Sequence, residues 1–113
     1  MRSDAERLDD ILAAAESAVR FTRPSGQGRT EDEVLLAALT YQIIIIGEAS
    51  RAISDETRAD FPTLPWHRMV GMRNRVVHAY WSVDSDNVWG TVETDLPQLI
   101  EELHRVLRPG RST

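Results

Sequence analysis

The chain has 113 residues, a net charge of −5, 42% hydrophobic and 27% charged residues, which fits one ordinary globular domain spanning residues 1–113. It has no cysteine, which excludes disulfides and thiolate zinc sites and leads us to expect a reducing, cytoplasmic location. The polar, acidic N-terminus is unlike a signal peptide, and the densest apolar run, Ile43 to Ile46, is too short to cross a bilayer, so no membrane partner is expected.

The first helix is predicted from a start signal and a stop signal. Ser3-x-x-Glu6 is a capping box, in which each side chain bonds the backbone of the other residue. The apolar residues that follow are spaced as one helical stripe until about Phe21. The stretch from Thr22 to Gly28 is a loop by composition.

The second predicted helix runs from about Glu31 to Ile53 and begins at a second capping box, Thr30-x-x-Glu33. Its middle, Ala37 to Ile46, is apolar nearly all round, which is typical of the central buried helix of a bundle. Gly47 lowers helix stability unless it permits a close approach of another helix. Glu48 follows the apolar core and is a candidate partner for a buried cation.

A short helix and a third long one are predicted next. Ser54 is an N-cap followed by acidic residues, and the short helix ends near Phe61. Pro65 suits the first turn of the third helix, which is expected from Trp66 to about Tyr80.

The last helix is predicted after a connector from Trp81 to Asp86, whose short polar residues are able to cap it. Its apolar residues run from Val88 to Leu107, and Pro97 should kink it because proline removes a backbone hydrogen bond. The sum is an all-α, up-and-down bundle of four main helices and one short helix.

The third helix carries most of the candidate chemistry. Between Pro65 and Tyr80 there are three arginines, two histidines and no acid. Arg73 falls within the apolar stripe, so it needs an ion pair, for example with Glu48, or a cleft to face. On an ideal helix Arg73 and His78 are about 140° apart. A common site therefore requires a long reach by the arginine, a loosened helix end or a second subunit.

The motif Arg73-Asn74-x-x-x-His78-x-Tyr80 resembles the signature of the HEPN superfamily, in the form carried by HepT-type toxins. Ile46-Gly47-Glu48-Ala49, Asp60 with the Phe61-Pro62 break, and Asp95-Leu96-Pro97 are similar to the same branch, so the resemblance covers essentially the whole chain. It implies the toxin of a type II/VII-like toxin–antitoxin pair: a homodimeric endoribonuclease that needs no metal or cofactor. It also implies a minimal nucleotidyltransferase as antitoxin, which transfers AMP from ATP onto the motif's tyrosine, here Tyr80.

The residue types suit cleavage of RNA. His78 is able to transfer a proton near neutral pH, and Arg73 is able to grip a phosphate and stabilise its developing charge. Asn74, one turn before His78, is expected to orient that histidine or bond the phosphate. Further arginines are expected to line an RNA groove: Arg51, Arg68 and Arg75, with Arg58 as an extension.

Two other readings remain open at this point. One is a catalytically inactive helical subunit that only binds a nucleotidyltransferase. The other is a helical regulator without any RNA role, in which Arg73 is simply a core ion pair and His67 a surface residue.

Overall fold

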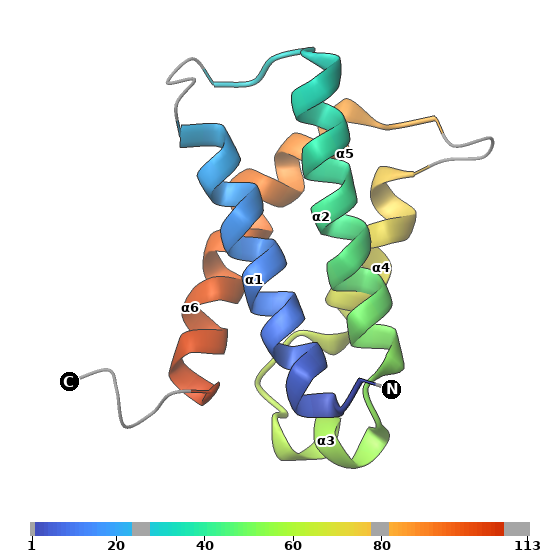
Figure 1. Cartoon of the computed structure of the whole chain (residues 1–113), viewed down its shortest axis with the longest axis vertical. Helices are drawn as coiled ribbons and strands as arrows, with labels where there is room; N and C mark the ends of the chain where they lie inside the picture. Colours follow the sequence, from blue (N-terminus) through green and yellow to red (C-terminus); the bar gives the residue numbers. More distant parts are fainter. Residues whose placement is uncertain (1, 24–27, 78–81, 108–113) are drawn as a thin grey trace.

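The computed structural model describes residues 2–23, 28–77 and 82–107, and its regular elements in these ranges are helices. Successive main helices run in alternating directions, which confirms the predicted all-α bundle (Figure 1). Four main helices pack together: α1, α2, α4, and the combined run of α5, η3 and α6; α3 is the short helix. The bounds are α1 Asp4–Thr22, α2 Glu33–Ala52, α3 Asp55–Asp60, α4 Trp66–Val76, α5 Ser85–Gly90, the π-helical segment η3 Thr91–Asp95 and α6 Leu96–Leu107.

The predicted start of α1 is confirmed, whereas that of α2 is wrong in its capping residue. Ser3 and Glu6 form the expected reciprocal capping box. In α2 the cap is Asp32, whose Oδ1 accepts the Leu35 N–H at 2.9 Å. A carboxylate this close to the exposed N–H groups of a first turn is the stronger acceptor. The Thr30 hydroxyl instead accepts the N–H of Asp32.

Helix α2 is the central helix and packs between α1 and α4, as predicted. Its composition suggested that it is buried on all sides, but one face is exposed. Leu39, Ile43 and Ile46 are fully buried on its inner face, while Val34 is 80% and Tyr41 62% exposed on the outer face. By length and hydropathy alone α2 is apolar enough to cross a membrane, with a mean hydropathy of 1.4 over its best window. Its inner face nevertheless forms the centre of the bundle's core.

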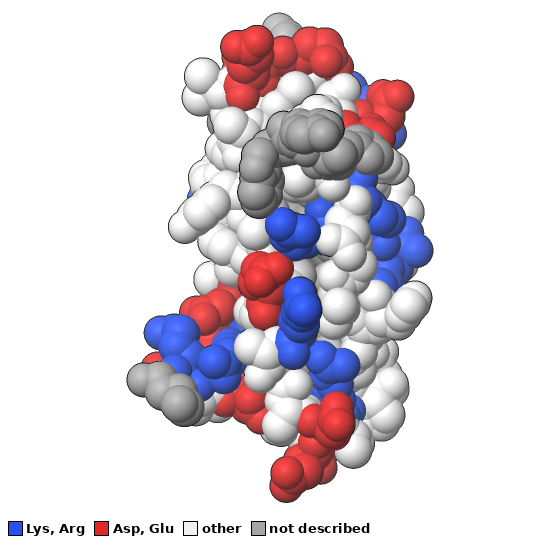
Figure 2. Space-filling view, turned by 90° about the vertical axis from the view of Figure 1, so that its right-hand side faces the viewer, with Lys and Arg blue, Asp and Glu red and all other residues white. Residues whose placement is uncertain are grey.

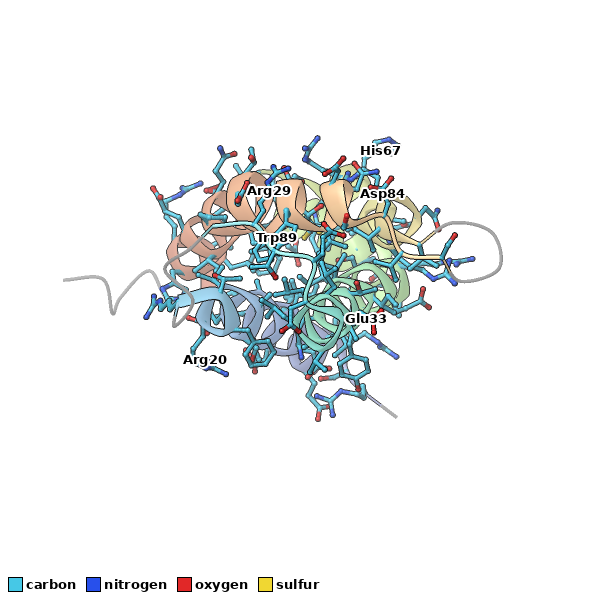
Figure 3. All side chains as sticks on the ribbon, turned by 90° about the horizontal axis from the view of Figure 1, so that it is seen from above. Arg20, Arg29, Glu33, His67, Asp84 and Trp89 are labelled. Atoms are coloured by element: carbon cyan, nitrogen blue, oxygen red, sulfur yellow. The ribbon has the colours of Figure 1, made fainter. Side chains whose placement is uncertain are left out.

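The kink expected at Pro97 takes the form of the π-helical segment just before it. The Leu96 N–H donates to the Thr91 carbonyl, five residues back instead of the four of an α-helix. The wider hydrogen-bond spacing lies next to Pro97, which has no backbone N–H to donate. Before this segment Trp89 is buried, and its Nε1 donates to the Thr30 carbonyl at 2.9 Å. The indole points into the bundle and ties the last helical run to the start of α2 (Figure 3).

One end of the bundle is closed by contacts between the start of α1 and α3. Ser54 caps α3 as predicted. The Asp4 carboxylate accepts hydrogen bonds from the Ser54 hydroxyl at 2.6 Å and the Thr57 hydroxyl at 2.7 Å. These hydrogen bonds, the one from Ser54 first, lower the pKa of Asp4 from its ordinary value.

Candidate active site

Helix α4 ends at Val76, four residues before the predicted end at Tyr80. Val77 is extended and forms an isolated antiparallel bridge with Val83, and the Asp84 N–H donates to the Val76 carbonyl at 2.9 Å. Two adjacent β-branched residues favour extended backbone, and the bridge satisfies groups that a longer helix would have used. The predicted extension of this helix is therefore wrong.

This early end changes the geometry of the motif. The 140° separation between Arg73 and His78 assumed a continuous helix, and the backbone has left the helix at Val77. Val77, the last residue before His78, is thus already outside the helix. A loosened helix end is one of the three ways in which we expected the two side chains to come together. His78 and Tyr80 themselves lie outside the described residues.

Arg73 is placed by the contact between α2 and α4. A Cβ added at Gly47 would stand 3.0 Å from the Arg73 Cβ, 3.3 Å from its backbone nitrogen and 3.6 Å from the Met69 carbonyl oxygen. Glycine is therefore what lets the two helices approach here, which confirms the role that its position suggested.

Glu48 and Asn74 both contact the guanidinium of Arg73 and help to orient it. Its Nε lies 3.5 Å from Glu48 Oε1, and its Nη1 donates to Asn74 Oδ1 at 3.2 Å. The expected partnership with Glu48 is confirmed, although the pair is half-exposed rather than buried: the side chains are 34% and 54% accessible. The contact with Asn74 was not expected, because adjacent residues on a helix do not normally face each other.

Two other predicted site arginines lie on the other edge of α4 and share one acid. Arg68 Nη2 is 2.6 Å from Asp95 Oδ1, and Arg75 Nη2 is 3.1 Å from Asp95 Oδ2. The Asp95 side chain is only 9% exposed, at the end of η3. Burial lowers the pKa of Arg75, against the opposing pull of Asp95. Sequence reasoning missed this role of Asp95, since its partners are 20 and 27 residues away.

The other two arginines predicted to bind RNA, Arg51 and Arg58, differ in their surroundings. Arg51 is exposed in the last turn of α2, one turn beyond Gly47. Arg58 donates to the Ser50 carbonyl at 2.9 Å and lies 5.6 Å above the Trp66 ring. Figure 2 shows the basic side chains of this face in several separate patches, with acidic side chains gathered mostly at its top and bottom ends. The structure thus places the arginines around α4 rather than in one row, and their role in binding RNA stays a prediction.

Neither described histidine contacts Arg73. His67 is exposed on α4 and points away from the bundle, as expected of a surface residue (Figure 3). His104 Nε2 lies 3.0 Å from Glu16 on α1. Along the sequence, His78 is the histidine nearest to Arg73, five residues after it.

A pocket of about 310 Å³ opens between α4 and α6, away from Arg73. Its floor is apolar, and its charged rim carries two acids and one arginine, which does not suit a polyanion such as RNA. The lining residues are Thr63, Pro65, Arg68, Met72, Asp95, Gln98, Leu99 and Glu102.

Comparison with known proteins places this geometry in context. A family model described as ribonuclease HepT-like matches residues 11–106. A protein of Methanocaldococcus jannaschii named as a putative RNase is 35% identical, over 88% of this chain and 92% of its own length. A protein of Thermococcus cleftensis named as a probable ribonuclease HepT is 36% identical, over 87% of this chain and 90% of its own. No solved structure gives a significant match.

Proposed function

Because the chain belongs to the HepT-like ribonuclease family, we propose that it is a metal-independent endoribonuclease that cleaves RNA by transesterification. The observation that carries the proposal is the Arg73 guanidinium, which Glu48 and Asn74 orient five residues before His78. A guanidinium held in this way binds a phosphate through two hydrogen bonds and stabilises the extra negative charge of a phosphorane.

In the proposed reaction an imidazole takes the proton from the ribose 2′-hydroxyl, and the oxygen attacks the neighbouring phosphorus. The bond from phosphorus to the 5′-oxygen breaks, and that oxygen receives a proton from an acid. The products are a 2′,3′-cyclic phosphate and a 5′-hydroxyl. His78, with an ordinary pKa of about 6.5, is suited to either proton transfer.

The reaction needs two proton transfers, while each chain supplies one His78. We therefore include a homodimer in the proposal, in which His78 of the partner subunit serves the second transfer. Both RNA and ATP are found in the cytoplasm, which is where the proposal places the protein.

We further propose that the protein is the toxin of a toxin–antitoxin pair and that a minimal nucleotidyltransferase neutralises it at Tyr80. The Tyr80 oxygen attacks the α-phosphorus of ATP, pyrophosphate leaves, and the hydroxyl proton passes to solvent. The attached AMP adds a negative charge and a bulky base two residues from His78. Charge and volume then both oppose RNA binding.

The nuclease proposal is tested with purified protein and RNA in EDTA. The wild type and His67→Ala should degrade RNA, whereas His78→Ala and Arg73→Ala should not, with folding checked by circular dichroism. His67→Ala is the matched control because it removes an exposed imidazole from the same helix. Equal background cleavage by all four proteins would favour an inactive partner subunit of the nucleotidyltransferase. A folded but inactive Arg73→Ala protein excludes a purely structural ion pair.

The switch is tested by mass spectrometry after incubation with the neighbouring nucleotidyltransferase and ATP. One or more AMP masses should be added to the wild type and to Tyr41→Phe, but not to Tyr80→Phe. Tyr41 is the matched control because the chain has two tyrosines. A mass that maps to another residue would show that Tyr80 is not the switch.

A further inference from the structure

The two arginines that share Asp95 lie on the opposite edge of α4 from Arg73. At about 100° per residue, Arg73 and Arg75 are about 160° apart around the helix, whereas Arg68 and Arg75 share one edge because they are seven residues apart. A helix with its side chains is about 10–12 Å wide. We therefore expect the two edges of α4 to meet different phosphates of a bound nucleic-acid strand.

Asp95 brings the guanidinium groups of Arg68 and Arg75 close together. Its nearly buried carboxylate contacts Nε and Nη2 of Arg68 through Oδ1 and Nη2 of Arg75 through Oδ2. Burial first, and then the nearby charge of Arg68, lower the pKa of Arg75 against the opposing effect of Asp95. A guanidinium has five N–H donors, so both groups keep donors for a further acceptor. Two arginines and one acid leave a net charge of +1, and the arginine side chains are 56% and 32% exposed, so an anion is able to approach from solvent.

The face of α4 between these two edges is open and has no acidic side chain of its own. It carries His67, Gly71 and Asn74, and the whole of α4 contains no acidic residue. His67 and Asn74 are exposed, and a Cβ added at Gly71 would meet no atom of the described residues within 4 Å. α4 lies on the side of the molecule that Figure 2 faces, where uncharged surface separates the basic patches. A strand that crosses α4 here therefore meets no negative charge from this helix.

We propose that Arg68 and Arg75, held together by Asp95, form a second phosphate subsite, which binds the RNA backbone at a phosphate beside the one that is cleaved. The strand then crosses the outer face of α4 from Arg73 to this pair. Arginine suits this role because its planar guanidinium donates two parallel hydrogen bonds to phosphate oxygens. Glu102, on the rim of the neighbouring pocket, disfavours a path between α4 and α6. The subsite rests on the proposed function, but it adds a contact that the chemical step itself does not need.

The first test is binding of single-stranded RNA, measured by fluorescence anisotropy. A fully 2′-O-methylated RNA is used, because it lacks the attacking hydroxyl and stays intact. Arg68→Gln and Arg75→Gln should each raise Kd about tenfold and reduce the slope of log Kd against log salt concentration by about 0.7. Arg29→Gln is the matched control and should leave Kd nearly unchanged. Arg29 is 49% exposed and also pairs with an acid of η3, Glu93.

Circular dichroism shows whether each variant is folded. Arg68 is the more exposed of the two arginines, so Arg68→Gln keeps the test valid if Arg75→Gln does not fold. Unchanged binding by the folded α4 variants, or an equal loss in Arg29→Gln, would overturn the subsite. The two ion pairs would then serve only to join α4 to η3.

The second test locates the phosphate that the subsite binds. A single methylphosphonate linkage, which is uncharged, is placed at successive positions of the same RNA. At one linkage beside the scissile one, it should weaken binding to the wild type about as much as Arg75→Gln does, and the variant should show no further loss there. At the linkage that Arg73 binds, the two losses should add, because independent contacts are additive. Additive losses at every linkage would contradict the subsite.

RNA cleavage is assayed separately, with unmodified RNA. Arg68→Gln and Arg75→Gln should raise KM with little change in kcat, because the subsite binds substrate and transition state equally. Cleavage by the wild type that neither substitution alters contradicts the subsite and leaves the nuclease intact. Coupling between Arg75 and one phosphate without any cleavage contradicts the nuclease and leaves the subsite as a site of RNA binding.

Discussion

Gly47 and Arg73 are in contact across the α2–α4 interface, at a distance that leaves no room for a side chain on Gly47. A Cβ there would lie 3.0 Å from the Arg73 Cβ and 3.3 Å from the Arg73 backbone nitrogen. The position of the candidate catalytic guanidinium is therefore set by how closely two helices pack.

Gly47→Ala should destabilise the protein and reduce RNA cleavage. Overpacking costs about 1–3 kcal/mol, while the gain in helix propensity is about 1 kcal/mol, so a net loss of up to about 2 kcal/mol is expected in urea unfolding. Gly71→Ala is the control: it also lies within a helix, and a Cβ there meets nothing within 4 Å. It should gain about 1 kcal/mol. If Gly47→Ala is as stable as Gly71→Ala, the contact does not constrain the helices.

Glu48→Gln should affect cleavage more than stability. The pair with Arg73 is partly exposed, 34% and 54%, so it contributes less than about 1 kcal/mol to unfolding. Loss of the carboxylate frees the guanidinium to rotate, and we expect about a tenfold lower kcat, or about 1.4 kcal/mol in activation free energy. Glu93→Gln removes the comparable ion pair with Arg29 and should leave kcat unchanged. An equal effect of both substitutions would argue against a positioning role for Glu48.

Asp95→Asn should lower the free energy of unfolding by about 1–3 kcal/mol, because two arginines lose a nearly buried counter-charge. The loss is below that for a fully buried pair since Arg68 is 56% and Arg75 32% exposed. Glu102→Gln on the neighbouring α6 breaks a pair with Arg105, whose side chain is 62% exposed, and should cost less than about 1 kcal/mol. Urea unfolding of the three proteins provides the comparison, and equal midpoints would refute the prediction.

The junction between α1 and α3 should weaken in acid. The folded pKa of Asp4 lies below its ordinary value of 3.8, so its contribution to stability is present above that value. The contribution is lost as the pH falls from there through the folded pKa. The difference in Tm between the wild type and Asp4→Asn should therefore be constant above about pH 5 and shrink at lower pH. Glu6 and Glu102 have lowered pKa values too, so the difference between the two proteins, rather than the wild type alone, isolates Asp4.

The chain's local signals predicted its helices well because they act over three or four residues. Ser3 and Ser54 cap the helices that they were expected to cap, and the apolar stripes give the right number of helices. Gly47 and Glu48 were singled out by position, and their contacts with Arg73 are confirmed. The same signals failed at Thr30, where Asp32 is a better acceptor two residues later.

The sequence by itself determined the helical class, the order of the helices and the residues of the motif, since periodicity and capping are properties of neighbouring residues. Only the tertiary structure decided where α4 stops, because its end depends on the bridge from Val77 to Val83. It also decided that Arg68 and Arg75 share Asp95, and that the described residues leave one face of α2 exposed. Contacts between residues tens of positions apart follow from how whole helices pack, and no short pattern along the chain records that packing.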